Sequence, residues 1–474
     1  MSNLTNSSAG KRILSLLDEN SFVEIGAGVL ARNTDFSTEK TDAPGDGVIT
    51  GYGAIDDALV YVYSQDASVL GGSIGEMHAK KILRLYDLAS KTGSPVIGLI
   101  DSTGLRINES TDALFALGKL YKRQTQLSGV VPQITAVFGN AGGGLAVLAG
   151  LSDFTFVEGK KGKLFISSPD SIKGNYEEKL DTASGAFQAS VGAVDVVEDD
   201  ENTLISRIRE LITFLPVNFE TEAYIGDSED DLNRAASDMA NCKEDTLLAL
   251  QRIADDNNFF ETKSAYGKNM VCGFMRLNGA TVGAVANRAA NTASDEKFDN
   301  VLNMQGSYKA AQFVKFCDAF NIPILTLTNV KGYCNCEHAA RGLAHAVSNM
   351  VAAFAGATVP RVNVIIGEAY GSASLAMNSI ATGCDVTYAW KDAKIAAIDA
   401  KHAAEILLDG KEMSEINKKA EEYDKVQASA ASAAARGYVD TVIDPADTRK
   451  YVIGAFEMLY SKDLAVIDKK HGTH

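Results

Sequence analysis

The chain has 474 residues, of which 46% are hydrophobic and 22% charged, so it can bury a large core and form more than one domain. Its net charge is -16 at pH 7, and no lysine or arginine run is long enough for a nucleic-acid footprint, which argues against DNA or RNA as a partner. All six cysteines lie in the second half and no secretory signal is evident at the start, so we expect a reducing, cytoplasmic location.

Strands and helices alternate along the first half, which is typical of an α/β fold. The expected elements are a helix running into a strand at 11–24, turns at 42–53 before a second strand, a strand at 58–65, a helix opening at 71–78 and ending at Gly93, a strand at 96–100, a helical stretch near 184–190 and a helix at 203–216. The strand at 96–100 ends in a small-residue turn, 101–107. Because ligands bind at the carboxyl ends of strands in such folds, we expect Gly104 and Arg106 to bind substrate.

A β-rich apolar run at 131–138 stops in the glycines Gly142, Gly143 and Gly144 and restarts as an Ala/Leu segment. This pattern predicts a buried strand, a tight turn and the start of a helix, and it makes a membrane span at 127–152 the weaker interpretation. The first N–H groups of a helix are unpaired donors, so such a turn can hold an oxyanion.

The same pattern recurs at 359–375, where Pro360, Gly367 and Gly371 each lie 228 residues after Pro132, Gly139 and Gly143. The second half also repeats the plan of the first, with a strand pair at 270–286, a helix at 308–320, a strand at 324–328 and a helix at 428–435. A constant offset indicates two domains related by internal duplication. We expect them at 1–225 and 246–474, joined by an acidic linker at 226–245.

Several stretches in order and at family-like spacing resemble the carboxyltransferase subunits of biotin-dependent acyl-CoA carboxylases and decarboxylases, of the propionyl-CoA carboxylase beta and methylmalonyl-CoA decarboxylase alpha type. They are LLDENSFVE, GDGVITGYG, QDASVLGGSIGEMHAKKI, SGVVPQI, FCDAFNIPIL, ATVPRVNVIIGEAYGSASLAMNS and RGYVDTVIDPADTR. The resemblance runs from about residue 11 to about residue 459. It implies two tandem crotonase (ClpP-like) domains.

The resemblance also implies the chemistry. Carboxyl transfer between a thioester α-carbon and biotin N1′ passes through two enolates, and each needs a pair of backbone donors. Gly143 and Gly144 match the family's donors for the acyl-CoA oxygen. Gly371, Ser372 and Ala373 match the turn for the biotin ureido oxygen, with Ser372 where the family usually has glycine. Leu375 falls where the family's acyl-chain preference is partly set.

The implied partners follow from the same family. The sequence has no Met-Lys-Met biotinylation tripeptide, so biotin is expected on a separate biotin carboxyl carrier protein. A biotin carboxylase or a membrane decarboxylase subunit would complete the system. Family members form homo-oligomers in which halves of different protomers face each other. The direction of the reaction is left open by this chain, with a slight lean to decarboxylation.

Several stretches depart from the family pattern. The turn at 101–107 replaces D-S-G-G-A-R-I, 140–145 replaces P-C-A-G-G-A, and 331–338 replaces the biotin-side loop, while 291–300 looks like an insertion. Cys334, Cys336 and His338 do not have a usual zinc spacing, so we expect a reduced loop and no metal.

Two rival functions remain. A hydratase or isomerase of crotonase type would need carboxylates beside an oxyanion turn, for which Glu109 and Asp112 are candidates. A non-catalytic or regulatory paralogue would explain the altered loop at 331–338. Among other residues, we expect His78 to be a core or interface histidine and Lys160, Lys161 and Lys163 to be a solvated charge run rather than a coenzyme A phosphate site. The serines in small-residue turns lack a histidine for a triad.

Overall fold

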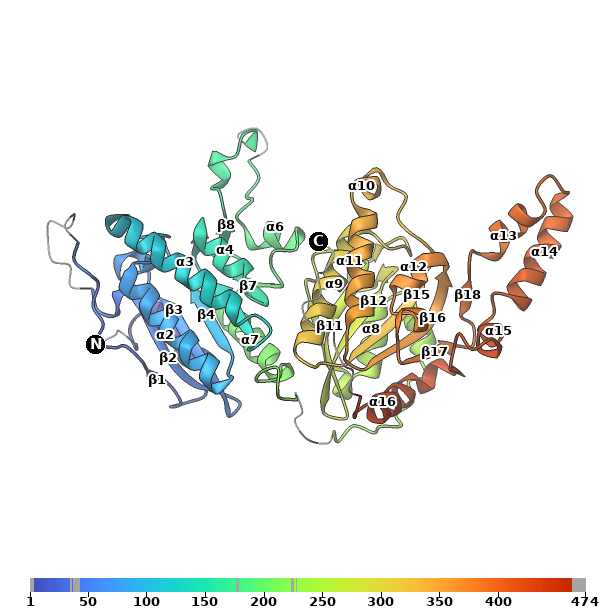
Figure 1. Ribbon diagram of the computed structural model, residues 1–474, viewed down its shortest axis with the longest axis horizontal. Coiled ribbons are helices and arrows are strands. Elements are labelled where there is room, and N and C mark those ends of the chain that lie inside the picture. The colour runs from blue at the N-terminus through green and yellow to red at the C-terminus, as the bar shows by residue number, and fades with distance from the viewer. Residues whose placement is uncertain are drawn as a thin grey trace. The chain divides into compact units, whose positions relative to one another are not determined.

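The computed structural model describes residues 4–34, 36, 43–175, 179–222, 226 and 228–462. The chain divides into two compact units, Met1–Ala223 and Tyr224–His474 (Figure 1). Each unit is an α/β domain built on one twisted sheet with helices on both faces.

The sheet of the first unit has the order β1-β2-β3-β4-β5-β7-β9. Its first three strands are antiparallel, and from β3 onward neighbouring strands are parallel. The bounds are β1 (Val23–Glu24), β2 (Val48–Ile55), β3 (Ala58–Gln65), β4 (Val96–Ile100), β5 (Gln133–Val137), β7 (Phe154–Glu158) and β9 (Val196–Glu198). A separate parallel pair joins β6 (Asn140–Gly142) to β8 (Lys163–Phe165).

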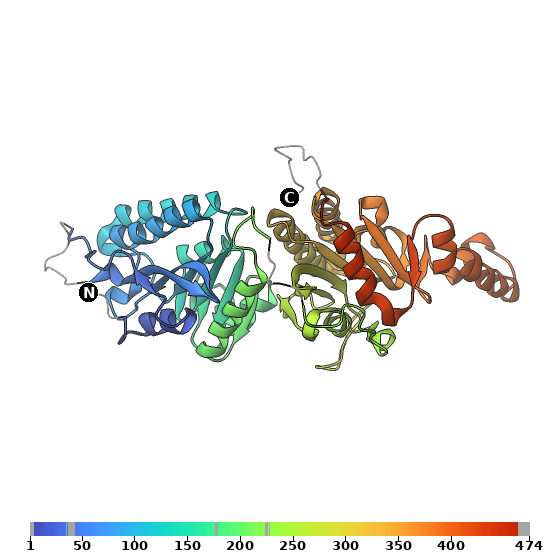
Figure 2. The same ribbon diagram turned by 90° about the horizontal axis from the view of Figure 1, so that it is seen from below.

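Helices cover both faces of this sheet because the parallel strands are apolar on both sides. Helices α2 and α3 lie along one face, and α1 and α7 pack on the other (Figure 2). The helices are α1 (Ser8–Leu16), α2 (Glu76–Thr92), α3 (Ser110–Gln126), α4 (Gly144–Gly150), α6 (Gly185–Ser190) and α7 (Glu201–Phe214). Helix α2 buries Ile82, Leu85 and Ala89, which recur at helical spacing.

Helix α2 begins later than the sequence suggested. Gly71 and Gly72 both have positive φ, which breaks any helix there, and the regular turns start only at Glu76. The C-cap at Gly93 is confirmed, with a left-handed φ of 62°.

The second unit repeats the plan, with the order β10-β11-β12-β15-β16-β17-β19 and β18 paired to β16. The bounds are β10 (Phe259–Thr262), β11 (Met270–Leu277), β12 (Ala280–Asn287), β15 (Ile324–Val330), β16 (Arg361–Tyr370), β17 (Val386–Trp390), β18 (Lys394–Ala396) and β19 (Thr441–Ile443). Again the first three strands are antiparallel and the rest parallel. The stretch expected as an insertion, 291–300, overlaps a small hairpin of β13 (Ala290–Asn291) and β14 (Glu296–Lys297).

Alternate residues of β11 serve the two faces of the second sheet. Val271 and Met275 join the core under α8 and α16, whereas the Phe274 ring lies 5.0 Å from that of Phe313 on α9. The helices are α8 (Thr246–Ile253), α9 (Met304–Ala319), α10 (Glu337–Ala340), α11 (Leu343–Gly356), α12 (Gly371–Ala376), α13 (Ala400–Leu407), α14 (Met413–Val426), α15 (Ala430–Ala435) and α16 (Thr448–Met458).

Matching hydrogen bonds hold consecutive parallel strands in the two units. In the first, the backbone N–H of Gln133 donates to Asp153 and that of Thr155 to Asp195. In the second, the backbone N–H of Arg361 donates to Asp385 and that of Thr387 donates to Asp440, at the equivalent strands. Each bond is 2.7 or 2.8 Å long, so the two sheets use the same device to fix consecutive parallel strands.

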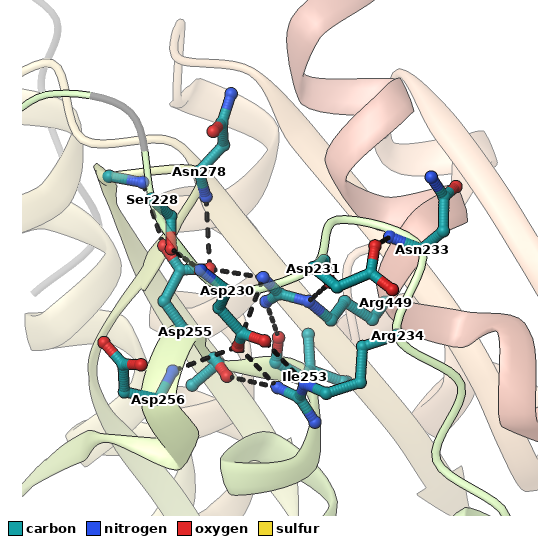
Figure 3. A network of polar contacts seen from close by, with 12 residues as sticks. Ser228, Asp230, Asp231, Asn233, Arg234, Ile253, Asp255, Asp256, Asn278 and Arg449 are labelled. Atoms are coloured by element: carbon teal, nitrogen blue, oxygen red, sulfur yellow. Dashed lines mark hydrogen bonds and ion pairs between the residues drawn. The ribbon is translucent and has the colours of Figure 1, made fainter.

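The segment expected as an acidic linker, 226–245, is grouped with the second unit, and its described part packs there (Figure 3). Arg234 forms two 2.9 Å bonds to the carboxylate of Asp230. The fully buried Arg449 of α16 reaches Asp255 at 2.7 Å and Asp230 at 3.4 Å. Asp230 of this stretch therefore pairs with the partly exposed Arg234 and the buried Arg449, a role that composition alone does not reveal.

Among the helices that the structure describes, none is long and apolar enough to cross a membrane. Residues 127–152 instead follow α3 and form the strands β5 and β6 and the helix α4.

Candidate active site: two matched glycine turns

The first glycine turn connects β6 to α4. Gly143 has φ 58° and ψ -122°, a conformation open in practice only to glycine. Its N–H donates to the carbonyl of Phe165 at 2.8 Å, which continues the pairing of β6 with β8. Gly143 therefore shapes the turn, and its own N–H is used inside the fold.

The next N–H groups, those of Gly144 and Leu145, belong to the first turn of α4, where donors have no intrahelical acceptor. Tyr121 of α3 donates its hydroxyl to the carbonyl of Gly144 at 2.6 Å. A Cβ on Gly144 would lie 2.7 Å from side-chain atoms of both Tyr121 and Leu117, so a larger residue there would displace these two side chains. Helix α3 thus fixes the orientation of the donor pair.

The second turn has the same construction. Gly371 has φ 60° and is the first residue of α12, and Ser372 and Ala373 are the next two residues of that helix. Ala373 is buried and Ser372 is exposed, and both contribute N–H groups to the first turn of the helix. Tyr333 donates its hydroxyl to Ser372 Oγ at 3.0 Å. The serine side chain is thus held by a neighbouring loop.

Below each turn a glycine packs against a polar side chain from the adjacent strand end. A Cβ on Gly139 would overlap Asp101, and a Cβ on Gly367 would overlap Asn329. These pairs occupy equivalent places in the two units. Asp101 is held in turn by Arg12 at 3.1 Å.

Arg106 lies at the end of the small-residue turn that follows β4. It is 8% exposed, and its guanidinium contacts Asp46, Glu109 at 2.9 Å and the Ser73 carbonyl at 2.7 Å. Gly104, expected to bind substrate with it, donates its N–H to Ser102 Oγ and accepts from Ile74 N–H at 2.9 Å. Both residues use these groups to hold the loop together.

His78 continues this buried network. Its N–H donates to Asp46 at 2.7 Å, and its Nε2 lies 3.2 Å from the side chain of Gln65. Burial lowers the pKa of His78 to about 3, and it lowers the pKa of nearby Lys81 to about 8. Burial also raises the pKa of Asp46, although Arg106 beside it acts in the opposite direction. The prediction of a core histidine is confirmed.

A cavity of about 790 Å³ adjoins the second turn. Its walls are largely apolar and come from α10, α11 and the preceding loop; they include Tyr333, Cys334, Cys336, Ala340, Leu343 and Val347. Tyr333 lines the cavity and also contacts Ser372, so one side chain connects the cavity wall to the turn. Leu375, on α12, is 43% exposed.

Other candidates have partners that limit their chemistry. Glu109 is buried against Arg106, and Asp112 pairs with Arg32. The Nζ of Lys161 lies 3.7 Å from the Glu201 carboxylate, and the Nζ of Lys163 lies 2.5 Å from the Asp181 carboxylate. Within the described residues, no group of three or more histidine, cysteine, aspartate or glutamate side chains is placed to hold a metal ion. The side chain of His338 lies outside them.

Sequence reasoning missed three contributors to the two turns. The carbonyl of Phe165 accepts a hydrogen bond from the Gly143 N–H. The hydroxyl of Tyr121 donates to the Gly144 carbonyl, and the hydroxyl of Tyr333 donates to Ser372 Oγ. Only Tyr333 carried a signal, because it lies in the loop at 331–338 that departs from the family pattern. The other two contacts join segments that no local pattern connects.

The carboxyl transferase domain family matches residues 6–474. The methylmalonyl-CoA decarboxylase subunit alpha of Propionigenium modestum is 37% identical over 482 residues, covering 98% of this chain and 92% of the relative. The propionyl-CoA carboxylase beta chain of Cereibacter sphaeroides is 39% identical over 478 residues, with the same two coverages. The crystal structure of transcarboxylase 12S with hydrolysed methylmalonyl-coenzyme A matches with a TM-score of 0.91 and 35% identity, over 98% of this chain and 92% of that one.

Proposed function

Since the chain belongs to the carboxyl transferase family, we propose that it moves a carboxyl group between the α-carbon of an acyl-CoA thioester and biotin N1′ on a separate carrier protein. The observation that carries this proposal is the repeated turn. Gly143 and Gly371 share a left-handed φ ahead of a short helix, so each unit presents its own pair of backbone donors. A reaction that develops negative charge on two different oxygens needs two such pairs.

In the first unit, Gly144 and Leu145 would hold the thioester oxygen. Their N–H groups are aimed by the glycine conformation at residue 143 and by the Tyr121 bond, so little reorganisation is needed when charge develops. The donors proposed here are shifted by one residue from the pair expected from sequence, because Phe165 already takes the Gly143 N–H.

In the second unit, Ser372 and Ala373 would hold the ureido oxygen of biotin. The adjoining cavity suits that group, since it offers apolar walls for the thiophane ring beside unpaired helix donors for the oxygen. Biotin, when bound, supplies the nitrogen that takes or gives the carboxyl group. The chain's own residues orient that nitrogen and exclude water from it.

The substrate we propose is a short acyl-CoA of the malonyl or methylmalonyl type. The relatives named above are a methylmalonyl-CoA decarboxylase subunit and a propionyl-CoA carboxylase chain. The exposed Leu375 on α12 provides an apolar contact for a short acyl tail. Arg106 and Gly104 serve as positioning residues that hold the loop at 71–74, rather than as direct ligands.

The proposed partners are a biotin carboxyl carrier protein and either a biotin carboxylase or a membrane decarboxylase subunit. A homo-oligomer would bring the first unit of one protomer to the second unit of another. The solved relative is described as a hexamer assembly with substrate bound to a multienzyme core, which supports an oligomeric assembly for this chain.

A hydratase or isomerase is the weaker candidate. It would need an available carboxylate beside an oxyanion turn, and Glu109 and Asp112 are both held by arginines. A second matched turn would have no use in such an enzyme.

Loss of the acyl-CoA carboxylate in the presence and absence of free biotin tests the proposal. We expect the purified protein to remove the carboxylate of methylmalonyl-CoA or malonyl-CoA only when biotin is present. Equal loss without biotin would contradict carboxyl transfer. No loss with either thioester, despite measurable coenzyme A binding, would favour the non-catalytic paralogue.

A further inference from the structure

The loop before α10 carries two thiols in contact. Cys334 donates to Cys336, with 2.7 Å between the two sulfur atoms. Cys336 is exposed and Cys334 is partly exposed, whereas Cys242, Cys272, Cys317 and Cys384 are buried. Solvent reagents can therefore reach one adjacent pair among the six cysteines of the chain.

The backbone before this pair is fixed. Cys334 donates its N–H to the Leu302 carbonyl at 2.8 Å, and Leu302 donates to Gly332 at 2.9 Å. Tyr333 lies between these bonds and reaches Ser372. The two sulfurs are thus held together one residue away from the side chain that contacts the second turn.

We propose that Cys334 and Cys336 form a reversible dithiol site that reacts with small-molecule disulfides and closes to an intramolecular disulfide. The two sulfurs are in direct contact and only one residue lies between them in the chain, so they can meet without the movement of any other segment. No metal and no residue of the first unit is needed for this reaction.

The reaction consists of two successive attacks of a cysteine thiolate on a disulfide. The Cys336 thiolate attacks one sulfur of the small disulfide, forming a mixed disulfide and releasing one small thiolate. Cys334 then loses its proton and attacks Cys336 Sγ, which releases the second small thiolate. Two protein thiols are oxidised, one small disulfide is reduced, and the two protons leave with the released thiols.

The order of attack follows from the hydrogen bond. The bond to Cys336 raises the pKa of Cys334, because donating it stabilises the protonated form of Cys334. Cys336, which accepts that bond and is more exposed, is therefore the first nucleophile, and Cys334 is the resolving thiol.

Closure also bears on the second turn. A disulfide across one intervening residue fixes the loop directly after Tyr333, and both sulfurs line the cavity beside Ser372. Resting on the proposed function, this predicts a biotin-dependent rate at least tenfold lower in the oxidised protein and restored by dithiothreitol.

The test treats the full-length native protein with oxidised glutathione, then alkylates the remaining thiols and maps them by mass spectrometry. We expect loss of alkylation at Cys334 and Cys336 together, a Cys334–Cys336 linked peptide, and recovery with dithiothreitol. Cys334→Ser is expected to stop at a glutathione adduct on Cys336. Unchanged alkylation of both thiols, or stable adducts without closure in the unmodified sequence, would overturn the proposal.

The thiol readout is independent of catalysis. A protein that closes the disulfide but shows no biotin-dependent turnover even when reduced would retain the dithiol site and contradict the proposed function. A protein that turns over but never closes the disulfide would do the reverse.

Discussion

Gly143 and Gly371 adopt nearly the same left-handed backbone angle, with φ of 58° and 60°, at positions 228 residues apart. Each one lies at the start of a short helix whose first N–H groups have no acceptor within the helix. This relationship makes glycine necessary at both positions for a conformational reason. It also makes each donor pair separately accessible to mutation.

Gly143→Ala should impair catalysis through the backbone. A Cβ there has open space, but the backbone conformation of φ 58° and ψ -122° costs about 1 to 3 kcal/mol for a residue other than glycine. Relaxing that angle moves the Gly144 N–H, and loss of one such donor costs about 100-fold or more in kcat. Steady-state kinetics with methylmalonyl-CoA and biotin measures the effect.

Gly150→Ala is the matched control, because it lies at the other end of α4 and a Cβ there meets nothing within 4 Å. It should leave kcat within about twofold, as expected of a surface change away from the donors. Equal losses in the two variants would point to damage of α4 and not of the donor pair.

Arg106→Met should destabilise the first unit by about 3 to 5 kcal/mol, because Asp46 and Glu109 would remain buried without their cation. Urea unfolding measures the change. Lys161→Ala removes an exposed ion pair with Glu201 and should cost less than about 1 kcal/mol. A loss below about 1 kcal/mol for Arg106→Met would show that the network does not hold the loop.

His78 should make stability depend on pH. Its pKa falls from 6.5 to about 3 on folding, so below pH 6.5 the unfolded chain binds a proton that the folded chain does not. The contribution is complete above pH 6.5 and is lost as pH falls toward 3, by up to about 1.4 kcal/mol per pH unit.

His78→Gln should therefore flatten the fall in unfolding free energy between pH 6.5 and 4.5. His402→Gln is the control, since its side chain is 65% exposed. Unfolding curves at several pH values provide the comparison. An unchanged slope in the His78 variant would mean that other groups carry the pH dependence.

The fold was largely predictable because local patterns specify it. The strand at 58–65, the C-cap at Gly93 and the helix in the Ala/Ser-rich stretch at 428–435 all appear as expected. The 228-residue offset also locates both turns from the residue spacing alone, since glycine at a fixed spacing indicates a backbone requirement. The sheet order then follows the same plan in both units.

The details of the site were less predictable, because they depend on contacts between distant segments. Phe165 takes the N–H of Gly143, and Arg106 turns inward to Asp46 and does not face a ligand. The acidic stretch at 226–245 looked like a linker by composition, yet Asp230 pairs with Arg234 and Arg449. One sequence does not reveal which charges meet.

The most direct test of the central claim removes a single backbone N–H from the second turn. Proline is tolerated in the first turn of a helix but has no N–H, so Ser372→Pro deletes the proposed donor, whereas Ser372→Ala keeps it. We predict that Ser372→Pro lowers biotin-dependent turnover about 100-fold while the Kd for the acyl-CoA stays within about twofold, and that Ser372→Ala keeps turnover within about threefold. Full turnover in Ser372→Pro, or a loss of acyl-CoA affinity equal to the loss of turnover, would contradict the assignment of the two turns to two substrates.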